Sequence, residues 1–378
     1  MNQTLFNQLK NLRQTLHKYP EVSGNEFETK QRVLEFCNGL SPSEIIPLGK
    51  TGLAVIFNSN EPGETVLIRG DMDALPIREI NTFEHASVFE AVSHKCGHDG
   101  HTAVLCGLAS HLAEQPVKTG KVVLLFQPAE ENGKGAQEII DDDRFYENEP
   151  DWVFAFHNLP GYPLHQTVVR EGAFTASAKS IIIKLDGKTS HAAEPELGYN
   201  PAQAIAEVIQ YGMDIAVTAI DSDGFFLVTP VYLNMGEKAY GISAGHGEVH
   251  LTLRSFSNGV MDAQSSRIAA EAKAIAEKYH LKATIQWTEV FAANENNAEA
   301  VELIKQSAKQ ENGLAVRAQP FKWGEDFGLF TQRYKGAMFG IGSGENCPAL
   351  HNPDYDFPDE IIPTAVEIFE TITRKILS

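Results

Sequence analysis

The segment VVLLFQPAEE, residues 122–131, runs from an apolar, β-rich stretch directly into two adjacent glutamates. Similar β-rich stretches occupy residues 53–57, 65–69 and 152–156, and a helical pattern occupies residues 102–114. Strands that alternate with helices of this length indicate a mainly parallel sheet covered by helices on both faces. The sequence therefore predicts an α/β fold built on a mixed, mainly parallel sheet.

The middle of the chain follows a different order of elements, βαββαβ. The pattern predicts four strands and two helices there, at residues 179–185, 201–219, 225–233, 247–256, 262–279 and 282–287. This order is the split βαβ arrangement of a small two-layer domain. After residue 294 the helix–strand–helix pattern returns. We therefore expect a catalytic domain formed by residues 1–177 and 292–378, with residues 178–291 inserted as a lid.

The composition limits the classes of function. The chain has 378 residues, of which 43% are hydrophobic, enough for one large or two ordinary domains. Its 31 basic and 50 acidic residues give a net charge of −19, so nucleic acid and membranes are not expected as partners. No apolar run approaches the roughly 18 residues that a membrane span requires. The 4 cysteines are too few for a disulfide scaffold, which favours a cytoplasmic location.

The residues that carry chemistry follow predicted strands. The two glutamates follow residues 122–127, His157 follows residues 152–156, and His351 lies beyond an apolar strand at residues 337–341. In open α/β sheets, ligands gather outside the carboxyl ends of the strands. Side chains that are distant in the sequence are therefore expected to converge at this edge.

The densest segment is SHKCGHDGH, residues 93–101, which contains three histidines, a cysteine and an aspartate. Thiolate, imidazole and carboxylate are the ligand set of zinc-type ions. The spacing matches no zinc finger, and a loop with a buried cysteine and incidental surface histidines is the alternative interpretation.

Glu130 and Glu131 are the second candidate pair. Adjacent residues of an extended chain point in opposite directions, so one carboxylate can bind metal while the other faces a substrate. A carboxylate beside metal-activated water also suits the role of general base. A solvated surface pair is the alternative.

Five ligand-type side chains are thus predicted at one edge of one sheet: Cys96, His98, Glu131, His157 and His351. Five exceed what a single tetrahedral site takes, so we expect two divalent metal ions that share a bridging ligand. Zinc suits thiolate and imidazole best, and manganese, cobalt or nickel also fit this mixture.

Seven motifs together resemble those of the aminoacylase-type metallo-amidohydrolases. This metallopeptidase-like group includes hippurate hydrolases, N-acetyldiaminopimelate deacetylases and hydrolases of auxin–amino-acid conjugates. The motifs are RGDMDALP (69–76), CGHDGHT (96–102), FQPAEE (126–131), FHNLP (156–160), GKTSHAAEP (187–195), GEDF (324–327) and LHNP (350–353). The resemblance implies a zinc-peptidase-like catalytic domain, an inserted lid and dimerisation domain, and a homodimer.

The resemblance also implies roles for the candidate ligands. Cys96 is expected to bridge the two metal ions. Glu131 and His351 are expected to complete one metal site, and His98 and His157 the other.

Further roles follow from the same resemblance. Glu130 is expected to act as general base, and Asp73 to orient a ligand from behind. Asp71 stands where related peptidases have a metal-binding histidine, and it is left out of the ligand set. His191 is expected to reach across a dimer interface and stabilise the tetrahedral oxyanion, with a surface or capping histidine as the alternative. Arg254 is expected to pair with a substrate carboxylate, with a salt bridge inside the lid as the alternative.

One segment departs from the family pattern. Residues 240–244 read Tyr-Gly-Ile-Ser-Ala, where family members usually have an Asn-Val-Ile-Pro run implicated in substrate contacts. Substrate specificity therefore does not carry over from better-known members.

The predicted activity is hydrolysis of the amide bond of N-acyl amino acids, with an N-acetyl or aromatic acyl group, by metal-activated water and Glu130. A dipeptidase or carboxypeptidase acting on short peptides is an alternative, because amide and peptide bonds require the same chemistry. A catalytically silent metal-binding homologue is a second alternative, although such a protein has no need for a base at Glu130.

Overall fold

The computed structural model describes all residues 1–378, and the chain forms two compact units. The first unit consists of Met1–Phe174, Asn294–Ala318 and Asp326–Ser378, and the second of Thr175–Ala293 and Gln319–Glu325. The short segment Gln319–Glu325 joins the second unit because it pairs with the chain there. The N–H of Ala176 donates to the carbonyl oxygen of Trp323 at 3.0 Å. From the sequence, this segment is predicted to belong to the catalytic domain, residues 1–177 and 292–378, instead.

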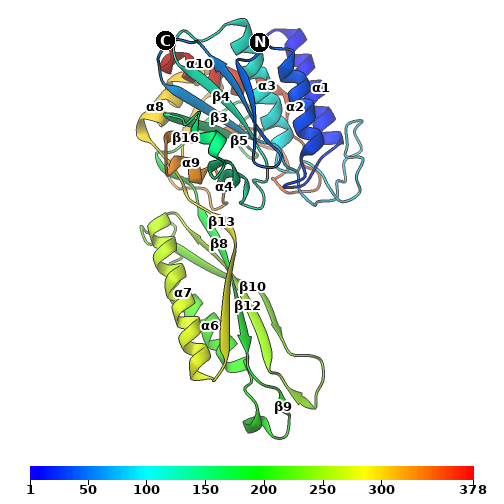
Figure 1. The fold of residues 1–378 in the computed structure, drawn as a ribbon, viewed down its shortest axis with the longest axis vertical. Helices are drawn as coiled ribbons and strands as arrows, with labels where there is room; N and C mark the ends of the chain where they lie inside the picture. The colour runs from blue at the N-terminus through cyan, green and yellow to red at the C-terminus, as the bar shows by residue number, and fades with distance from the viewer. The chain divides into compact units, whose positions relative to one another are not determined.

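The first unit is built on an eight-stranded sheet with the strand order β1-β2-β4-β3-β5-β16-β6-β15 (Figure 1). The strands are β1 (Glu44–Leu48), β2 (Gly52–Asn58), β3 (Thr65–Asp71), β4 (Lys121–Gln127), β5 (Trp152–Leu159), β6 (Thr167–Val169), β15 (Leu314–Val316) and β16 (Lys335–Gly342). The four central strands β4, β3, β5 and β16 run parallel to one another. Strands β1, β2 and β6 pair antiparallel with a neighbour. The predicted mixed, mainly parallel α/β sheet is thus confirmed.

Both faces of this sheet are buried. Val66 and Ile68 of β3 join a core cluster with residues of the helices on one face, whereas Leu67 points to the other face and is also fully buried. A strand with two buried faces reads as a continuous apolar run, which explains why the sequence predicts these strands well. The helices are α1 (Gln3–Lys18), α2 (Phe27–Asn38), α3 (His98–Glu114), α4 (Gly135–Ile140), α5 (Asp143–Tyr146), α8 (Ala298–Ser307), α9 (Gly328–Thr331) and α10 (Ile362–Ile376).

The second unit has the order βαββαβ, as the sequence predicts. Its four strands form an antiparallel sheet in the order β10-β12-β8-β13. The elements are β8 (Ser177–Asp186), α6 (Ala202–Asp214), β10 (Phe226–Met235), β12 (His246–Ser255), α7 (Asn258–Lys278) and β13 (Lys282–Phe291). Ile181, Ile183 and Leu185 of β8 pack with the two helices in a separate core. None of the helices in either unit is both long and apolar enough to span a membrane.

Two local expectations at the site are wrong. Helix α3 begins at His98 rather than at residue 102, because Gly97 adopts a left-handed φ of 97° that turns the chain directly into the helix. Glu130 does not lie in an extended chain: the N–H of Gly133 donates to its carbonyl oxygen at 2.8 Å and closes a turn. The opposite orientation of adjacent side chains in a strand therefore does not apply to Glu130 and Glu131.

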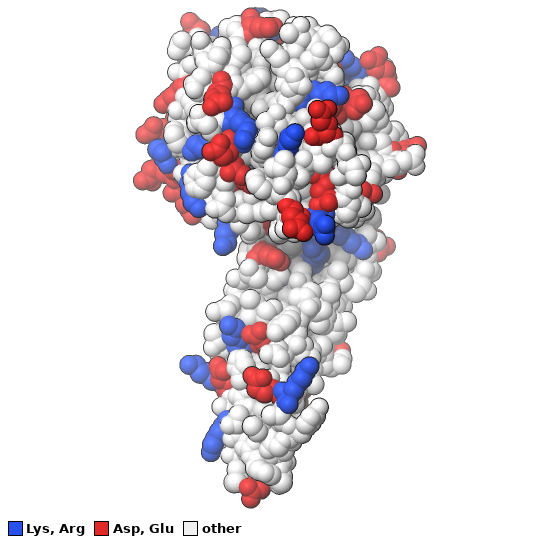
Figure 2. Space-filling view, turned by 90° about the vertical axis from the view of Figure 1, so that its right-hand side faces the viewer, with Lys and Arg blue, Asp and Glu red and all other residues white.

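The charged side chains are dispersed. On the face of the first unit drawn in Figure 2, acidic and basic side chains are interspersed, and no large basic area is present. This distribution agrees with a solvated, net acidic surface.

Candidate metal centre

The five predicted ligands and Glu130 all belong to the first unit, at the carboxyl ends of its central strands. Cys96 and His98 stand at the start of α3, and His157 lies near the end of β5. Glu130 and Glu131 follow β4, and His351 lies in the loop after β16. Parallel strands bring these segments to one edge, as expected for ligand sites in open α/β sheets.

The ligand atoms form two groups that share a cysteine. In each group the atoms lie within 4.8 Å of one another; the groups are Cys96, His98, His157 and Cys96, Glu131, His351. The Sγ of Cys96 is 3.6 Å from Nε2 of His157, and Oε1 of Glu131 is 3.5 Å from Nε2 of His351. Ligand atoms on one tetrahedral zinc ion are about 3.3–3.8 Å apart, given bonds of about 2.0–2.3 Å. The geometry therefore fits two ions with Cys96 between them.

Two buried atoms in this centre have no hydrogen-bond partner. They are Nε2 of His98 and Oε1 of Glu131, which lie 3.9 Å apart. Buried polar atoms are nearly always paired, because an unpaired one costs free energy. Two such atoms facing each other are the arrangement that a bound cation would satisfy.

The electrostatics of the centre also suit cations. Burial, together with the carboxylates of Glu131 and Glu130, raises the pKa of the Cys96 thiol well above its usual value. Burial opposes the charged form of His98, but Asp71 and Asp73 outweigh it and raise its pKa to about 10. Clustered carboxylates therefore make this pocket electronegative, and a divalent cation is the species that would compensate them.

His157 is a candidate ligand in its neutral form. Burial and the neighbouring His101 lower the pKa of His157 well below its usual value. Its Nδ1 donates to the carbonyl oxygen of Asn158 at 2.9 Å, so Nε2 is directed towards Cys96. Neutral imidazole with its other nitrogen held in this way is the form that binds metal.

Asp73 supports two candidate ligands at once. The Nδ1 of His98 donates to Oδ1 of Asp73 at 3.2 Å and to its carbonyl oxygen at 2.9 Å. The Oδ2 of Asp73 accepts from the N–H of Glu131 at 3.1 Å and from Oγ of Ser23 at 2.6 Å. The carboxylate of Asp73 thus fixes the ring of His98 and the backbone of Glu131 together.

His101 and Asp71 lie within 4.8 Å of His98, but their polar atoms are already hydrogen-bonded. The Nδ1 of His101 donates to Asp71, and its Nε2 donates to Oδ1 of Asn158 at 2.6 Å. The Oδ2 of Asp71 accepts from Arg69 at 2.5 Å. The amide of Asn158 also donates to the carbonyl oxygen of Cys96 at 3.0 Å. These residues form a buried support beneath Cys96.

Glu130 is held by a part of the chain that the sequence analysis leaves without a role. The N–H of Asp326 donates to Oε1 of Glu130 at 3.4 Å. The carboxylate of Asp326 accepts from Arg69 at 2.7 Å and from Gln127 at 2.9 Å. Glu130, Glu131 and His98 form a third group of ligand-type atoms within 4.8 Å. In the sequence, the members of this network are marked only by three motifs, RGDMDALP with Arg69, FQPAEE with Gln127 and Glu130, and GEDF with Asp326.

The other two predicted site residues belong to the second unit. His191 is exposed on β9 (Ser190–His191), which pairs with β11 (Ile242–Ser243). Arg254 on β12 donates to the carbonyl oxygen of Lys322 at 2.8 Å, within the same unit. Tyr240, in the segment that departs from the family pattern, is 98% exposed. The neighbouring carbonyl oxygen of Gly241 accepts from the N–H of Ala192, so this segment adjoins His191.

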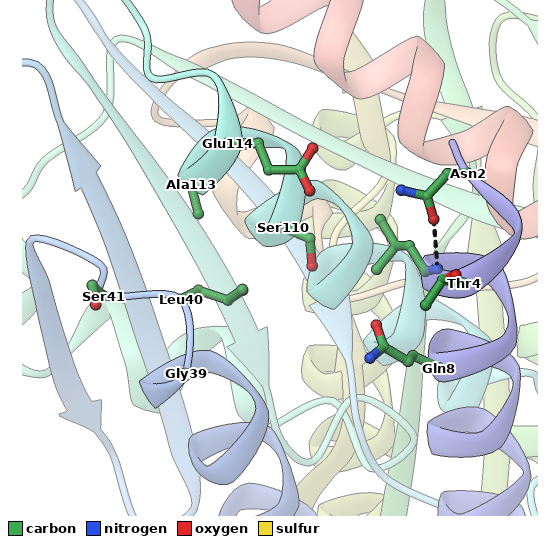
Figure 3. Close-up of a pocket in the computed structure, with 10 residues that line it drawn as sticks. Asn2, Thr4, Gln8, Gly39, Leu40, Ser41, Ser110, Ala113 and Glu114 are labelled. Atoms are coloured by element: carbon green, nitrogen blue, oxygen red, sulfur yellow. Dashed lines mark hydrogen bonds between the residues drawn. The ribbon is translucent and has the colours of Figure 1, made fainter.

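A surface cavity of about 380 Å³ lies elsewhere on the first unit, between the start of α1, the end of α2 and the last turns of α3 (Figure 3). Ser110 and Glu114 line it from α3, about 20 Å along the helix from His98. None of the predicted site residues lines this cavity.

The chain is similar in sequence to proteins of one known family. The sequence profile described as "Peptidase family M20/M25/M40" matches residues 67–375. The chain is 30% identical over 371 residues to N-acetyldiaminopimelate deacetylase of Bacillus pumilus, covering 97% of this chain and 98% of that protein. It is 29% identical over 376 residues to hippurate hydrolase of Campylobacter jejuni, covering 99% of this chain and 97% of that protein.

The fold is similar to a solved structure from Bacillus subtilis, a dinuclear metal-binding peptidase from the M20 family. The two superpose with a TM-score of 0.84 at 26% sequence identity, covering 100% of this chain and 99% of that chain.

Proposed function

Because the chain belongs to peptidase family M20/M25/M40, whose members hydrolyse amide bonds, we propose that it cleaves the amide bond of N-acyl amino acids. The observation that carries this proposal is the pair of ligand groups that share Cys96, with Glu130 beside them. A water molecule adds to the amide carbon, the C–N bond breaks, and a carboxylate and a free amino acid are released.

The proposed ligands are those of the two groups. Cys96 would bridge two divalent ions, with His98 and His157 on one and Glu131 and His351 on the other. Ions held there lower the pKa of water and polarise the amide carbonyl. Zinc is the proposed metal, because the centre combines a thiolate with imidazoles.

Glu130 is the proposed general base. Its carboxylate takes a proton from the attacking water and passes it to the nitrogen of the leaving amine. The N–H of Asp326 at 3.4 Å supports this role, because it limits the rotation of the carboxylate.

The second unit is proposed to act as a lid and as the surface that forms a homodimer. Strand β10 is an edge strand, and its Val231 and Leu233 are each 56% exposed. Such an edge is suited to pairing with a second copy of the chain. His191, exposed on the same unit, is proposed to stabilise the oxyanion, and Arg254 to bind the substrate carboxylate.

The substrate class rests on two relatives. The names of both refer to N-acyl amino acids, since hippurate is an N-benzoyl amino acid.

We further propose a reducing, cytoplasmic location, because all four cysteines are free and a thiolate ligand such as Cys96 would be lost on oxidation.

The test is hydrolysis of a panel of N-acetyl amino acids, N-benzoyl amino acids and dipeptides by protein of measured metal content. The wild type is expected to prefer the acyl amino acids. Glu130→Gln should keep its metal and lose about 10²–10⁴-fold in rate. Preference for dipeptides would make the protein a peptidase. Full activity of the Glu130 variant would refute the mechanism, and inactivity on the whole panel would favour a silent homologue.

A further inference from the structure

Helix α1 carries an arginine that is almost completely buried, outside the proposed metal centre. Arg13 is 1% exposed, and its guanidinium donates to Asp356 at 2.6 Å and to Asp359 at 2.8 Å. It also lies 3.4 Å from Oδ2 of Asp99. A buried charge is tolerated only when it is well paired, and here one cation satisfies carboxylates from two distant segments.

Those carboxylates stand beside proposed metal ligands. Asp99 directly follows His98 in the first turn of α3, against which α1 packs (Figure 1). Asp356 and Asp359 belong to the segment that begins with His351. Arg13 is therefore the common partner of the segment that carries Cys96 and His98 and of the segment that carries His351.

A second path from the same helix reaches the same two segments. His17, one turn after Arg13, contacts Asp99 at 2.9 Å and Glu79 at 3.0 Å. Glu79 accepts from Nζ of Lys95 at 2.5 Å, and Lys95 adjoins Cys96. The Nζ of Lys95 also donates to the carbonyl oxygen of Tyr355 at 2.7 Å. Both paths thus connect α1 to the two ligand-bearing segments.

We infer that Arg13 is a positioning residue of the metal centre, which fixes the His351 segment against the segment that carries Cys96 and His98. This inference rests on the proposed ligand set. A metal site requires its ligands to be held to within about 0.5 Å. Without the guanidinium, His17 would remain on Asp99 and Lys10 on Asp359, but the two segments would lose the buried cation that pairs with carboxylates of both. Repulsion between these carboxylates and entry of water would displace the segments, and with them the imidazole of His351.

The effect should fall mainly on one of the two ions. The His98 side is also anchored by Asp73 and by helix α3, whereas Arg13 pairs with two carboxylates of the segment after His351. Loss of Arg13 is therefore expected to lower the affinity for the ion at Glu131 and His351 about 10–100-fold. The affinity for the ion at His98 and His157 should change by less than about threefold.

The experiment measures zinc stoichiometry and both zinc dissociation constants on the full-length chain, by competition with a chromophoric chelator. The variants are Arg13→Met and Arg13→Lys, and the matched control is Lys10→Met. Lys10 pairs with the same Asp359 at 3.4 Å but is 44% exposed. Arg13→Lys should give an intermediate loss, because a point charge cannot reproduce the planar fork. Lys10→Met should bind zinc like the wild type.

The outcomes separate this inference from the proposed function. A wild-type chain that binds fewer than two ions would refute the proposed ligand set, independently of the results with the Arg13 variants. A folded Arg13→Met variant that binds both ions with wild-type affinity would overturn the positioning role. If that variant does not fold, Arg13→Lys and Asp356→Asn decide the question. If both variants bind the ion at Glu131 and His351 with wild-type affinity, the inference is refuted. If they lose affinity for this ion and keep it for the ion at His98 and His157, the inference is supported.

Discussion

The backbone N–H of His351 donates a hydrogen bond of 2.7 Å to the carbonyl oxygen of Lys95. This bond joins the segment of Cys96 to the loop after β16 at the position of the proposed ligand itself. His351 has a φ of 66°, a left-handed conformation that costs energy for a residue with a side chain. The bond to Lys95 therefore helps to hold the backbone in the one conformation that directs the imidazole towards Glu131.

Removal of the shared thiolate should change the number of metal ions bound. Cys96→Ala deletes the only atom common to both ligand groups, so we expect the zinc content to fall from two ions per chain to one or fewer. Elemental analysis after dialysis checks this. Cys37→Ala, at a buried cysteine outside the centre, should retain the full content. Two ions in Cys96→Ala would show that the cysteine is not a bridge.

Asp73 should control metal affinity without binding metal. Asp73→Ala removes the carboxylate acceptor for His98, which keeps only the carbonyl oxygen of residue 73, and it removes the bond to the backbone of Glu131. Zinc affinity should therefore fall about 10–100-fold. Chelator competition measures the effect. Ser23→Ala removes only the outer bond to the same carboxylate and should have a much smaller effect. Equal effects of the two substitutions would contradict the orienting role.

Asp326 should affect the rate more than substrate binding. Asp326→Asn removes the charge that pairs with Arg69, so the loop should relax and its N–H should move from Glu130. We expect kcat to fall about tenfold, which corresponds to about 1.4 kcal/mol, with KM nearly unchanged. Steady-state kinetics on the best acyl substrate provide the test, with the exposed Asp141→Asn as control. A change confined to KM would contradict this prediction.

Acid should weaken folding through Glu79. Burial disfavours its charge, but bonds from His17 and Lys95 outweigh burial and lower the pKa of Glu79 from 4.5 to about 2. A carboxylate with a depressed folded pKa contributes stability above its unfolded pKa and loses it as the pH falls towards the folded value. The wild type should therefore be more stable than Glu79→Gln at pH 7, and this difference in free energy of unfolding should decrease by about 1 kcal/mol at pH 4. Urea titrations at both pH values measure it, and a constant difference would refute it.

Gly100 should tolerate no side chain. A Cβ at this position would lie 2.4 Å from ring atoms of Phe357, which is itself 1% exposed and cannot move aside. Gly100→Ala is expected to lower the free energy of unfolding by about 1–3 kcal/mol. Gly241→Ala, where no heavy atom lies within 4 Å, should be nearly neutral. If both variants are equally stable in urea unfolding, the structure accommodates the contact between the new Cβ and Phe357 without loss of stability.

The central sheet could be predicted from the sequence because its strands are buried on both faces. Continuous apolar runs identify β2, β3, β4 and β5, and residues that follow such strands meet at one edge. Strands β6 and β15 have 3 residues each, too few to show a period of two, and the sequence analysis did not find them.

The supporting residues of the site could not be assigned in the same way. His101 lies in the same motif as His98, and only the positions of Asp71 and Asn158 show that its two nitrogens are already used. The bond from Asp326 to Glu130 joins two loops that no local pattern relates. The start of α3 at His98 depends on the backbone angle of Gly97, which composition does not reveal.

The sequence positions of the proposed ligands have a consequence for biosynthesis. Cys96, His98, Glu131 and His157 leave the ribosome well before His351 and the two aspartates after it that pair with Arg13. A nascent chain can therefore assemble the Cys96–His98–His157 group long before the Cys96–Glu131–His351 group exists. A chain released before residue 351 would contain the residues of the first group and lack those of the second.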